Sequence, residues 1–119
     1  MAKREAIFTE RELDVMHVLW DRKTGTVAEV RDLIQDELAY TTILTVLRTL
    51  EQKGFVEHEM EGRSYRYHPV VSREDAREAH LRRLLTSVFG GSPSALVEKL
   101  LSSGRIPDAE LRRIRELVC

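Results

Sequence analysis

Residues 40–54, YTTILTVLRTLEQKG, constrain the fold of this chain more than any other stretch. Ile43, Val46, Leu47 and Leu50 recur at i, i+3, i+4 and i+7, which predicts a helix with one apolar face. The opposite face carries short polar side chains and one positive charge: Thr41, Thr45, Arg48 and Gln52. Gly54 ends this helix and a strand–turn–strand pattern follows. A helix that buries one face, with a hairpin directly behind it, favours a winged helix-turn-helix.

Two helices are predicted before this one, each opened by a capping box. Thr9 stands three residues before Glu12, and Thr26 stands three residues before Glu29. Thr24-Gly25 between the two helices is expected to be a turn. The second helix is expected to turn five apolar side chains inward and to reach the third through a short Ala39-Tyr40 connection; these side chains are Val27, Val30, Leu33, Ile34 and Leu38.

The hairpin is predicted from two strands, residues 55–60 and 64–70, joined by a turn at residues 61–63. Gly62 supplies a residue able to take positive φ, and Pro69 limits the ladder near its end. The alternation of Tyr65 and Tyr67 with polar neighbours is typical of a half-buried strand.

The rest of the chain predicts three more helices. The first starts at Ser72 and runs to about Phe89, the second starts at Ser92-Pro93, and the third starts at Pro107-Asp108. Three short helices cannot bury their apolar stripes alone, so a second copy of the chain is the expected partner. We therefore predict a mainly α protein with a small β-hairpin wing: a winged helix-turn-helix in residues 1–70 and a helical dimerisation region in residues 71–119. The expected dimer contacts are Leu81, Leu84, Leu85, Val88, Leu96, Leu100, Leu111, Ile114 and Leu117.

Bulk charge gives no support to a nucleic-acid partner. The net charge is −1, with ten Lys/Arg and thirteen Asp/Glu in residues 1–69, and nine and seven in residues 70–119. Binding to DNA would therefore depend on local placement of charge. A single cysteine, no apolar run long enough for a membrane span and no apolar signal core together indicate a cytoplasmic protein without membrane insertion.

The candidate chemistry is recognition of double-stranded DNA. The third helix suits the major groove, where Arg48 can donate to guanine or grip a phosphate and threonines can reach bases, methyls or phosphates. Free backbone N–H groups at its start favour a phosphate, and the hairpin arginines can reach flanking backbone. The predicted contacts are Thr26, Thr41, Thr42, Leu44, Thr45, Arg48, Thr49, Gln52, Arg63 and Arg66.

Metal binding and catalysis are not expected. The four histidines are widely spaced, although His58 and His68 could face each other across the hairpin, and Cys119 offers no paired-cysteine clamp. No catalytic motif appears, so we expect neither an enzyme nor a cofactor.

Residues 40–75, together with LDVMHVLW, TVAEVRDLI and RIPDAELRRIREL elsewhere in the chain, resemble the penicillinase-repressor family of BlaI/MecI/CopY-type regulators. The resemblance implies a homodimeric repressor that reads palindromic operators with its third helix. It also implies release when a membrane-linked sensor peptidase triggers cleavage in the C-terminal region and so breaks the dimer.

Three features depart from the family pattern. Arg48 stands one position before the place where many members carry arginine, and Thr49 occupies that place. The resistance regulators are cut at an Asn-Phe bond, whereas this chain has no asparagine and its corresponding pair is Lys99-Leu100. Copper-responsive members end in paired Cys-x-Cys motifs, whereas this chain has only Cys119. Two alternatives stay open: a winged-helix regulator that senses a small ligand, and a winged-helix protein-assembly module without DNA binding.

Overall fold

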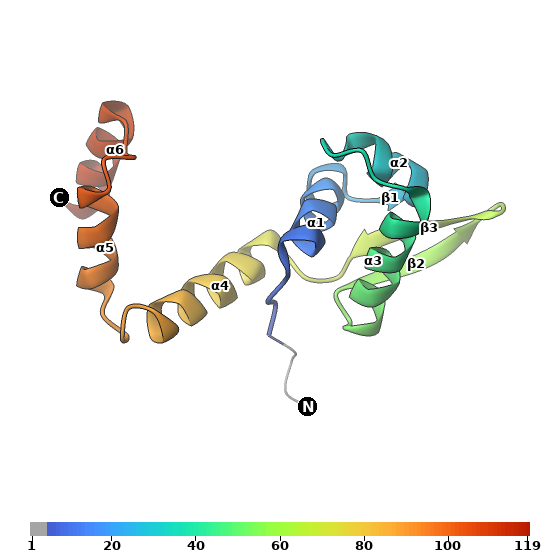
Figure 1. Ribbon diagram of the computed structural model, residues 1–119, viewed down its shortest axis with the longest axis horizontal. Coiled ribbons are helices and arrows are strands. Elements are labelled where there is room, and N and C mark those ends of the chain that lie inside the picture. Colours follow the sequence, from blue (N-terminus) through green and yellow to red (C-terminus); the bar gives the residue numbers. More distant parts are fainter. Residues whose placement is uncertain (1–4) are drawn as a thin grey trace. The chain divides into compact units, whose positions relative to one another are not determined.

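The computed structural model describes residues 5–119, which form two compact units. The first unit extends to His80 and the second is Leu81–Cys119. The first contains α1 (Glu10–Arg22), β1 (Gly25–Thr26), α2 (Val27–Leu33), α3 (Tyr40–Gln52), β2 (Val56–Glu61) and β3 (Ser64–Pro69) (Figure 1). Helix α4 (Arg73–Ser87) begins in the first unit and ends in the second, which also holds α5 (Pro93–Ser102) and α6 (Asp108–Val118). The predicted fold class is confirmed.

Both predicted capping boxes are present. Thr9 and Glu12 exchange hydrogen bonds at the start of α1, with the Thr9 N–H donating to Glu12 Oε1 at 2.8 Å and the Glu12 N–H to Thr9 Oγ1 at 3.2 Å. Thr26 and Glu29 do the same at the start of α2, at 3.3 and 3.2 Å. These bonds satisfy N–H groups that the first helical turn leaves without partners.

The second helix is shorter than predicted. It ends at Leu33 because Ile34 adopts extended backbone, with ψ near 135°. Leu33 is 44% exposed rather than inward-facing. The connection to α3 is residues 34–39 instead of the two residues expected. Arg11 holds this connection through an ion pair with Asp36 at 3.0 Å.

The wing is a three-stranded antiparallel sheet in the order β1-β3-β2. The predicted turn at Thr24-Gly25 is wrong in part, because Gly25 and Thr26 form β1 and pair with Tyr67 and Arg66. A Cβ on Gly25 would lie 3.0 Å from Val30 Cγ2, so the close approach of α2 requires glycine. The hairpin loop is Gly62-Arg63, since Glu61 already pairs with Ser64.

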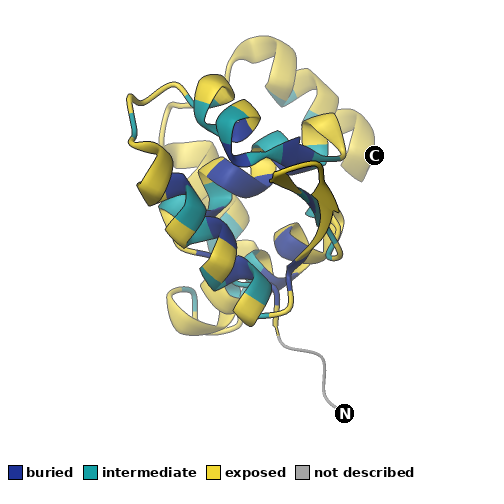
Figure 2. Cartoon of the chain, turned by 90° about the vertical axis from the view of Figure 1, so that its right-hand side faces the viewer, coloured by how far each residue is buried: buried dark blue, intermediate teal, exposed yellow. Residues whose placement is uncertain are grey.

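The core of the first unit lies where α1, α2 and α3 meet the base of the sheet (Figure 2). Val15, Met16 and Leu19 come from α1, and Ile43, Leu47 and Leu50 from α3. This cluster holds α3 by the apolar face predicted from its sequence and leaves the opposite face in solvent.

The second unit lacks a buried core. Its helices form as predicted, with Ser92 accepting a hydrogen bond from the Ala95 N–H at 3.2 Å and Pro93 at the first helical position. The end of α4 at Ser87 comes before the predicted Phe89. No side chain from Leu81 to Cys119 is buried. Its exposed large apolar residues are Leu81, Leu84, Val88, Val97, Leu100, Leu101, Leu117 and Val118. Among residues 5–119, every helix is too short or too polar to cross a membrane.

Candidate nucleic-acid interface

Helix α3 presents a polar row to solvent over its full length. Thr41, Thr42, Thr45, Arg48 and Gln52 are exposed, while Leu44, Val46 and Thr49 lie half-buried along the edges of that row. The Arg48 guanidinium makes no hydrogen bond or ion pair with another described residue, so all of its donors are available to a ligand. The row therefore offers one uncommitted cation among neutral side chains.

Two threonines of α3 already donate their hydroxyl protons to the helix backbone. Thr45 Oγ1 donates to the Thr41 carbonyl and Thr49 Oγ1 to the Thr45 carbonyl, each at 2.9 Å. A hydroxyl whose proton is used in this way still accepts hydrogen bonds and still presents its methyl group. Such a surface suits the amino group of adenine or cytosine and the methyl of thymine better than the acceptors of guanine. Thr45 is the exposed member of the pair.

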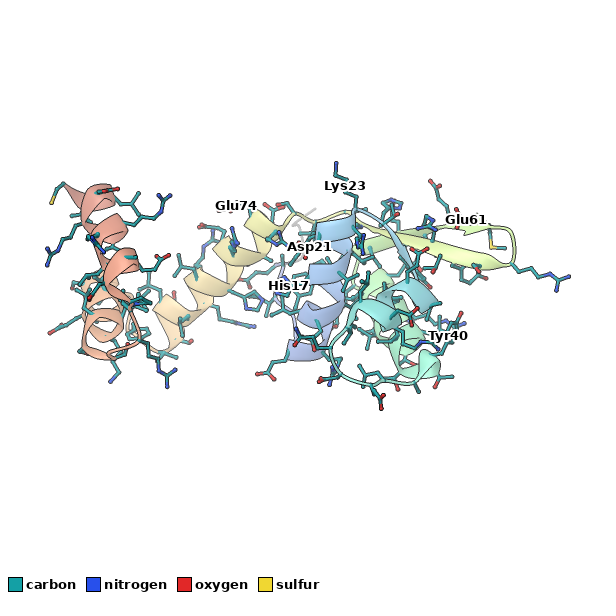
Figure 3. The ribbon with its side chains drawn as sticks, turned by 90° about the horizontal axis from the view of Figure 1, so that it is seen from above. His17, Asp21, Lys23, Tyr40, Glu61 and Glu74 are labelled. Atoms are coloured by element: carbon teal, nitrogen blue, oxygen red, sulfur yellow. The ribbon has the colours of Figure 1, made fainter. Side chains whose placement is uncertain are left out.

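The start of α3 is open to an anion. Ala39 is the N-cap residue and no side chain caps the helix there. Free N–H groups and the positive end of the helix dipole favour a phosphate at such a terminus. Tyr40, expected in the connection, is the first helical residue and is 45% exposed (Figure 3). Its phenol hydroxyl is a further donor that the sequence did not single out.

Strand register sorts the hairpin into two chemically different faces. Glu57 pairs with His68 and Glu59 with Arg66, which places the acidic residues of β2 on one face. The alternate pairs are His58 with Tyr67 and Met60 with Tyr65, which form a second face without carboxylates. His58 and His68 therefore do not oppose each other as the sequence allowed.

The aromatic face is the one next to α3. His58 Nδ1 lies 2.7 Å from the Glu51 carboxylate of α3, and Tyr67 is buried in the core. Burial, and then the charge of Glu51, raises the pKa of the Tyr67 phenol. Further out, Tyr65 contacts His58 with ring centroids 4.5 Å apart, and Met60 is largely exposed. The acidic residues of β2 are thus kept off the side of the hairpin that adjoins α3.

The two hairpin arginines differ in their availability. Arg63 lies in the loop, exposed and without an ion pair to a described residue (Figure 3 shows the neighbouring Glu61). Arg66 donates to Glu29 at 3.0 and 3.1 Å, to Glu61 at 2.8 and 3.1 Å and to Thr24 at 3.2 Å. Hydrogen bonds with Glu61 and Glu29 raise the pKa of Arg66 above its already high value, and the bond with Arg66 lowers the pKa of Glu29.

Arg66 therefore fastens β3 to the start of α2, and a phosphate could use it only after displacing two carboxylates. Thr26 is engaged in its capping box as well. DNA contacts by Arg66 and Thr26 stay predictions. The described residues contain no group of three or more His, Cys, Asp or Glu side chains able to hold a metal ion.

Comparison with known proteins agrees with this geometry. The model of the penicillinase repressor family matches residues 8–119. The penicillinase repressor of Bacillus licheniformis is 25% identical over 112 residues, covering 92% of this chain and 88% of that protein. The methicillin resistance regulatory protein MecI of Staphylococcus aureus (strain N315) is 21% identical over 109 residues, covering 90% and 89%.

Solved structures give the same fold. The solution structure of the DNA-binding domain of the repressor BlaI is similar with a TM-score of 0.55 and 30% identity, covering 62% of this chain and 93% of that one. The fold of hsRosR-S4 is also similar, with a TM-score of 0.52 and 19% identity over 81% and 88% of the two chains. The chain belongs to the penicillinase repressor family of DNA-binding transcriptional repressors, which are not enzymes.

Proposed function

We propose that this chain represses transcription as a homodimer that places each α3 in a major groove of a palindromic operator. The observation that carries the proposal is the α3 row: an uncommitted Arg48 among exposed threonines, beside a hairpin face free of carboxylates. Arg48 would donate to a guanine edge or a phosphate, and Thr45 would accept from a base or meet a thymine methyl. Arg63, and Tyr40 at the start of α3, would hold the flanking backbone. Such a repressor acts in the cytoplasm, where its operator lies.

The second unit supports the dimer. Leucines and valines on α4, α5 and α6 remain exposed in the single chain, as the expected dimer contacts would before pairing. A second copy would cover them and would link two half-sites, which raises operator affinity by effective concentration. The partners on this proposal are operator DNA and the chain itself.

We also propose that proteolysis within the second unit ends repression. Lys99 and Leu100 are exposed but lie inside α5, so a peptidase would reach their peptide bond only after that helix unwinds locally. Loss of the segment beyond this bond would remove α6 from the dimer surface. A membrane-linked sensor peptidase is the partner that this route requires.

Replacing Arg48 with alanine tests the reading role of α3. Duplexes selected by the wild-type chain from random DNA serve as operators. The Arg48→Ala variant should bind them about 1–3 kcal/mol more weakly, or roughly 5- to 150-fold, and should lose preference at one base position in each half-site. The exposed Arg77 of α4 gives the matched control, Arg77→Ala, which should leave affinity unchanged. Unchanged affinity and base preference for Arg48→Ala would refute the role.

The salt dependence distinguishes the two contacts open to Arg48. If the guanidinium grips a phosphate, Arg48→Ala weakens all duplexes alike, and the slope of log affinity against log salt falls by about one. If it donates to a base, discrimination is lost and the slope stays close to that of the wild type.

A further inference from the structure

The first two turns of α4 are fastened to the winged helix by a group of aromatic and charged side chains. We call this group the α4 clasp: Phe8, Trp20, Asp21, Arg73 and His80. Trp20 Nε1 donates to the Val71 carbonyl at 2.8 Å, just before α4 begins. Arg73 pairs with Asp21, and its guanidinium carbon lies 5.5 Å from the centre of the Trp20 ring. Figure 3 shows Asp21 on α1 and Glu74 at the start of α4.

The clasp holds α4 at a second point one to two turns further on. The Phe8 N–H donates to His80 Nε2 at 3.1 Å, and the two rings stack with centroids 6.2 Å apart. Phe8 also meets the Trp20 ring edge-on at 6.0 Å, which joins the two points of attachment. Between them, Ala76 and Ala79 are buried, and their small side chains let the helix approach closely.

Several directional contacts at two points fix both the position and the rotation of this part of α4, where apolar packing alone would allow it to slide. Helix α4 then continues through Leu81 and Leu84 to Ser87. The turns of α4 beyond His80 belong to the same hydrogen-bonded helix and carry predicted dimer residues, so continuous helical backbone links the clasp to them.

We infer that the α4 clasp sets the spacing and relative rotation of the two half-sites that the dimer accepts. The inference rests on the proposed function, because it requires a dimer that reads two half-sites. The five residues of the α4 clasp are then positioning residues. They touch no DNA but determine where the second α3 meets the duplex. Half-site spacing is a geometric property of the dimer, and one added base pair turns a half-site by about 35°.

The test measures affinity against half-site spacing for full-length protein. The probes are a wild-type-selected operator, the same duplex with two base pairs added or removed between its halves, and a duplex with one half-site. The wild type should lose about 100-fold when the spacing changes, because the linked second half-site no longer engages. The clasp variant Trp20→Phe/Arg73→Ala should lose only about 10-fold, with single-half-site affinity unchanged.

Three further variants are measured in the same assay. Arg73→Ala alone removes only the charged part of the clasp and serves if the double variant does not fold. Arg73→Lys keeps a cation beside Asp21 and Trp20 and should restore most of the spacing preference. Arg77→Ala, an exposed arginine on the same helix, should behave as the wild type. Sedimentation should show a dimer for every variant.

An equal spacing penalty in the wild type and the clasp variants would overturn the inference and leave the proposed function intact. Loss of single-half-site binding in the clasp variants would also overturn it, since the clasp would then support the winged helix itself. If the wild type gained nothing from a second half-site, the proposed dimeric function would fail, and the inference would fail with it.

Discussion

The ion pair between Glu12 and Lys53 gives a stability prediction that can be worked through. Lys53 Nζ lies 2.7 Å from Glu12 Oε2 and joins the C-terminal end of α3 to the start of α1. The Glu12 residue is 5% exposed, whereas the Lys53 side chain is 32% exposed. Replacing Lys53 with methionine keeps the apolar stem and removes the charge. Glu12 would then be a buried carboxylate that keeps the hydrogen bond from the Thr9 N–H but has lost its counter-ion.

The expected cost at neutral pH is about 2 kcal/mol. At 2.7 Å and an effective dielectric of about 20, the gross attraction is roughly 6 kcal/mol, most of which is offset by desolvation of the two ions. Removal of one partner from a fully buried pair costs about 3–5 kcal/mol, and the exposure of Lys53 reduces this by about half. The fluorescence of Trp20, the one tryptophan of the chain, reports urea unfolding of the first unit.

The pH dependence distinguishes loss of the ion pair from loss of packing by the lysine stem. Burial raises the pKa of Glu12, but hydrogen bonds from Lys53 and Thr9 outweigh it, so the folded pKa lies below the usual value. A depressed folded pKa contributes stability that is present above the unfolded pKa of about 4.3 and is lost as pH falls through the folded pKa. Without Lys53, the pKa of Glu12 lies higher than in the wild type, because the hydrogen bond and charge of Lys53 no longer lower it, and the carboxyl takes up its proton at a higher pH. The cost of Lys53→Met should therefore shrink as pH falls below about 4.3 and through the lowered folded pKa of Glu12.

A double-mutant cycle with Glu12→Gln isolates the pair. The coupling energy should be about 1–2 kcal/mol at pH 7, and the exposed lysine variant Lys99→Met should leave the Trp20 transition unchanged. A cost below about 0.5 kcal/mol at pH 7, or a cost that does not fall as the pH is lowered towards acid unfolding, would refute the electrostatic reasoning.

Two further changes should alter the stability of the first unit, both measured by urea unfolding at Trp20. Arg66→Lys should lower the midpoint of urea unfolding at pH 7, because one ammonium cannot reproduce the planar guanidinium between Glu29 and Glu61. The difference from the wild type should diminish as pH falls through the lowered pKa of Glu29, and equal stability at pH 7 would count against the network. Lys23→Gly should stabilise the first unit by about 1 kcal/mol. Lys23 follows the last residue of α1 with φ 75°, a backbone conformation that glycine adopts without strain. A loss of stability would show that the lysine stem contributes more to folding than its backbone strain costs.

The helices could be predicted because their signals are local. Capping pairs such as Thr9 with Glu12, the apolar period of α3 and the Ser92-Pro93 start depend on neighbours within a turn or two. The end of α2 could not, because Leu33 and Ile34 continue the apolar period and only the tertiary path of the chain takes them out of the helix. Strand β1 was missed for a related reason: two residues pair with β3 from far along the sequence.

The candidate site divides in the same way. The exposed row of α3 could be predicted from its helical period, but the sequence could not show which polar side chains are free and which are already hydrogen-bonded. The ion pairs of Arg66 join residues far apart in sequence, and the committed hydroxyl protons of Thr45 and Thr49 depend on rotamers. The face that carries Met60 and Tyr65 could not be assigned, because the turn was expected to span residues 61–63 and the strand register was left open. A two-residue loop at Gly62-Arg63 fixes the register, and the register then gives the face.

The contrast between the two units bears on how repression would depend on protein concentration. The first unit has a closed core, whereas the second buries no side chain in the single chain. Short helices without tertiary packing are marginal in water, so α5 and α6 draw their stability from whatever covers them. On the proposed dimer, folding of the second unit and pairing of two chains become one equilibrium. Operator occupancy would then rise more steeply than linearly with protein concentration, and a cut in α5 would end repression by removing the fold of the dimer surface as well as its area.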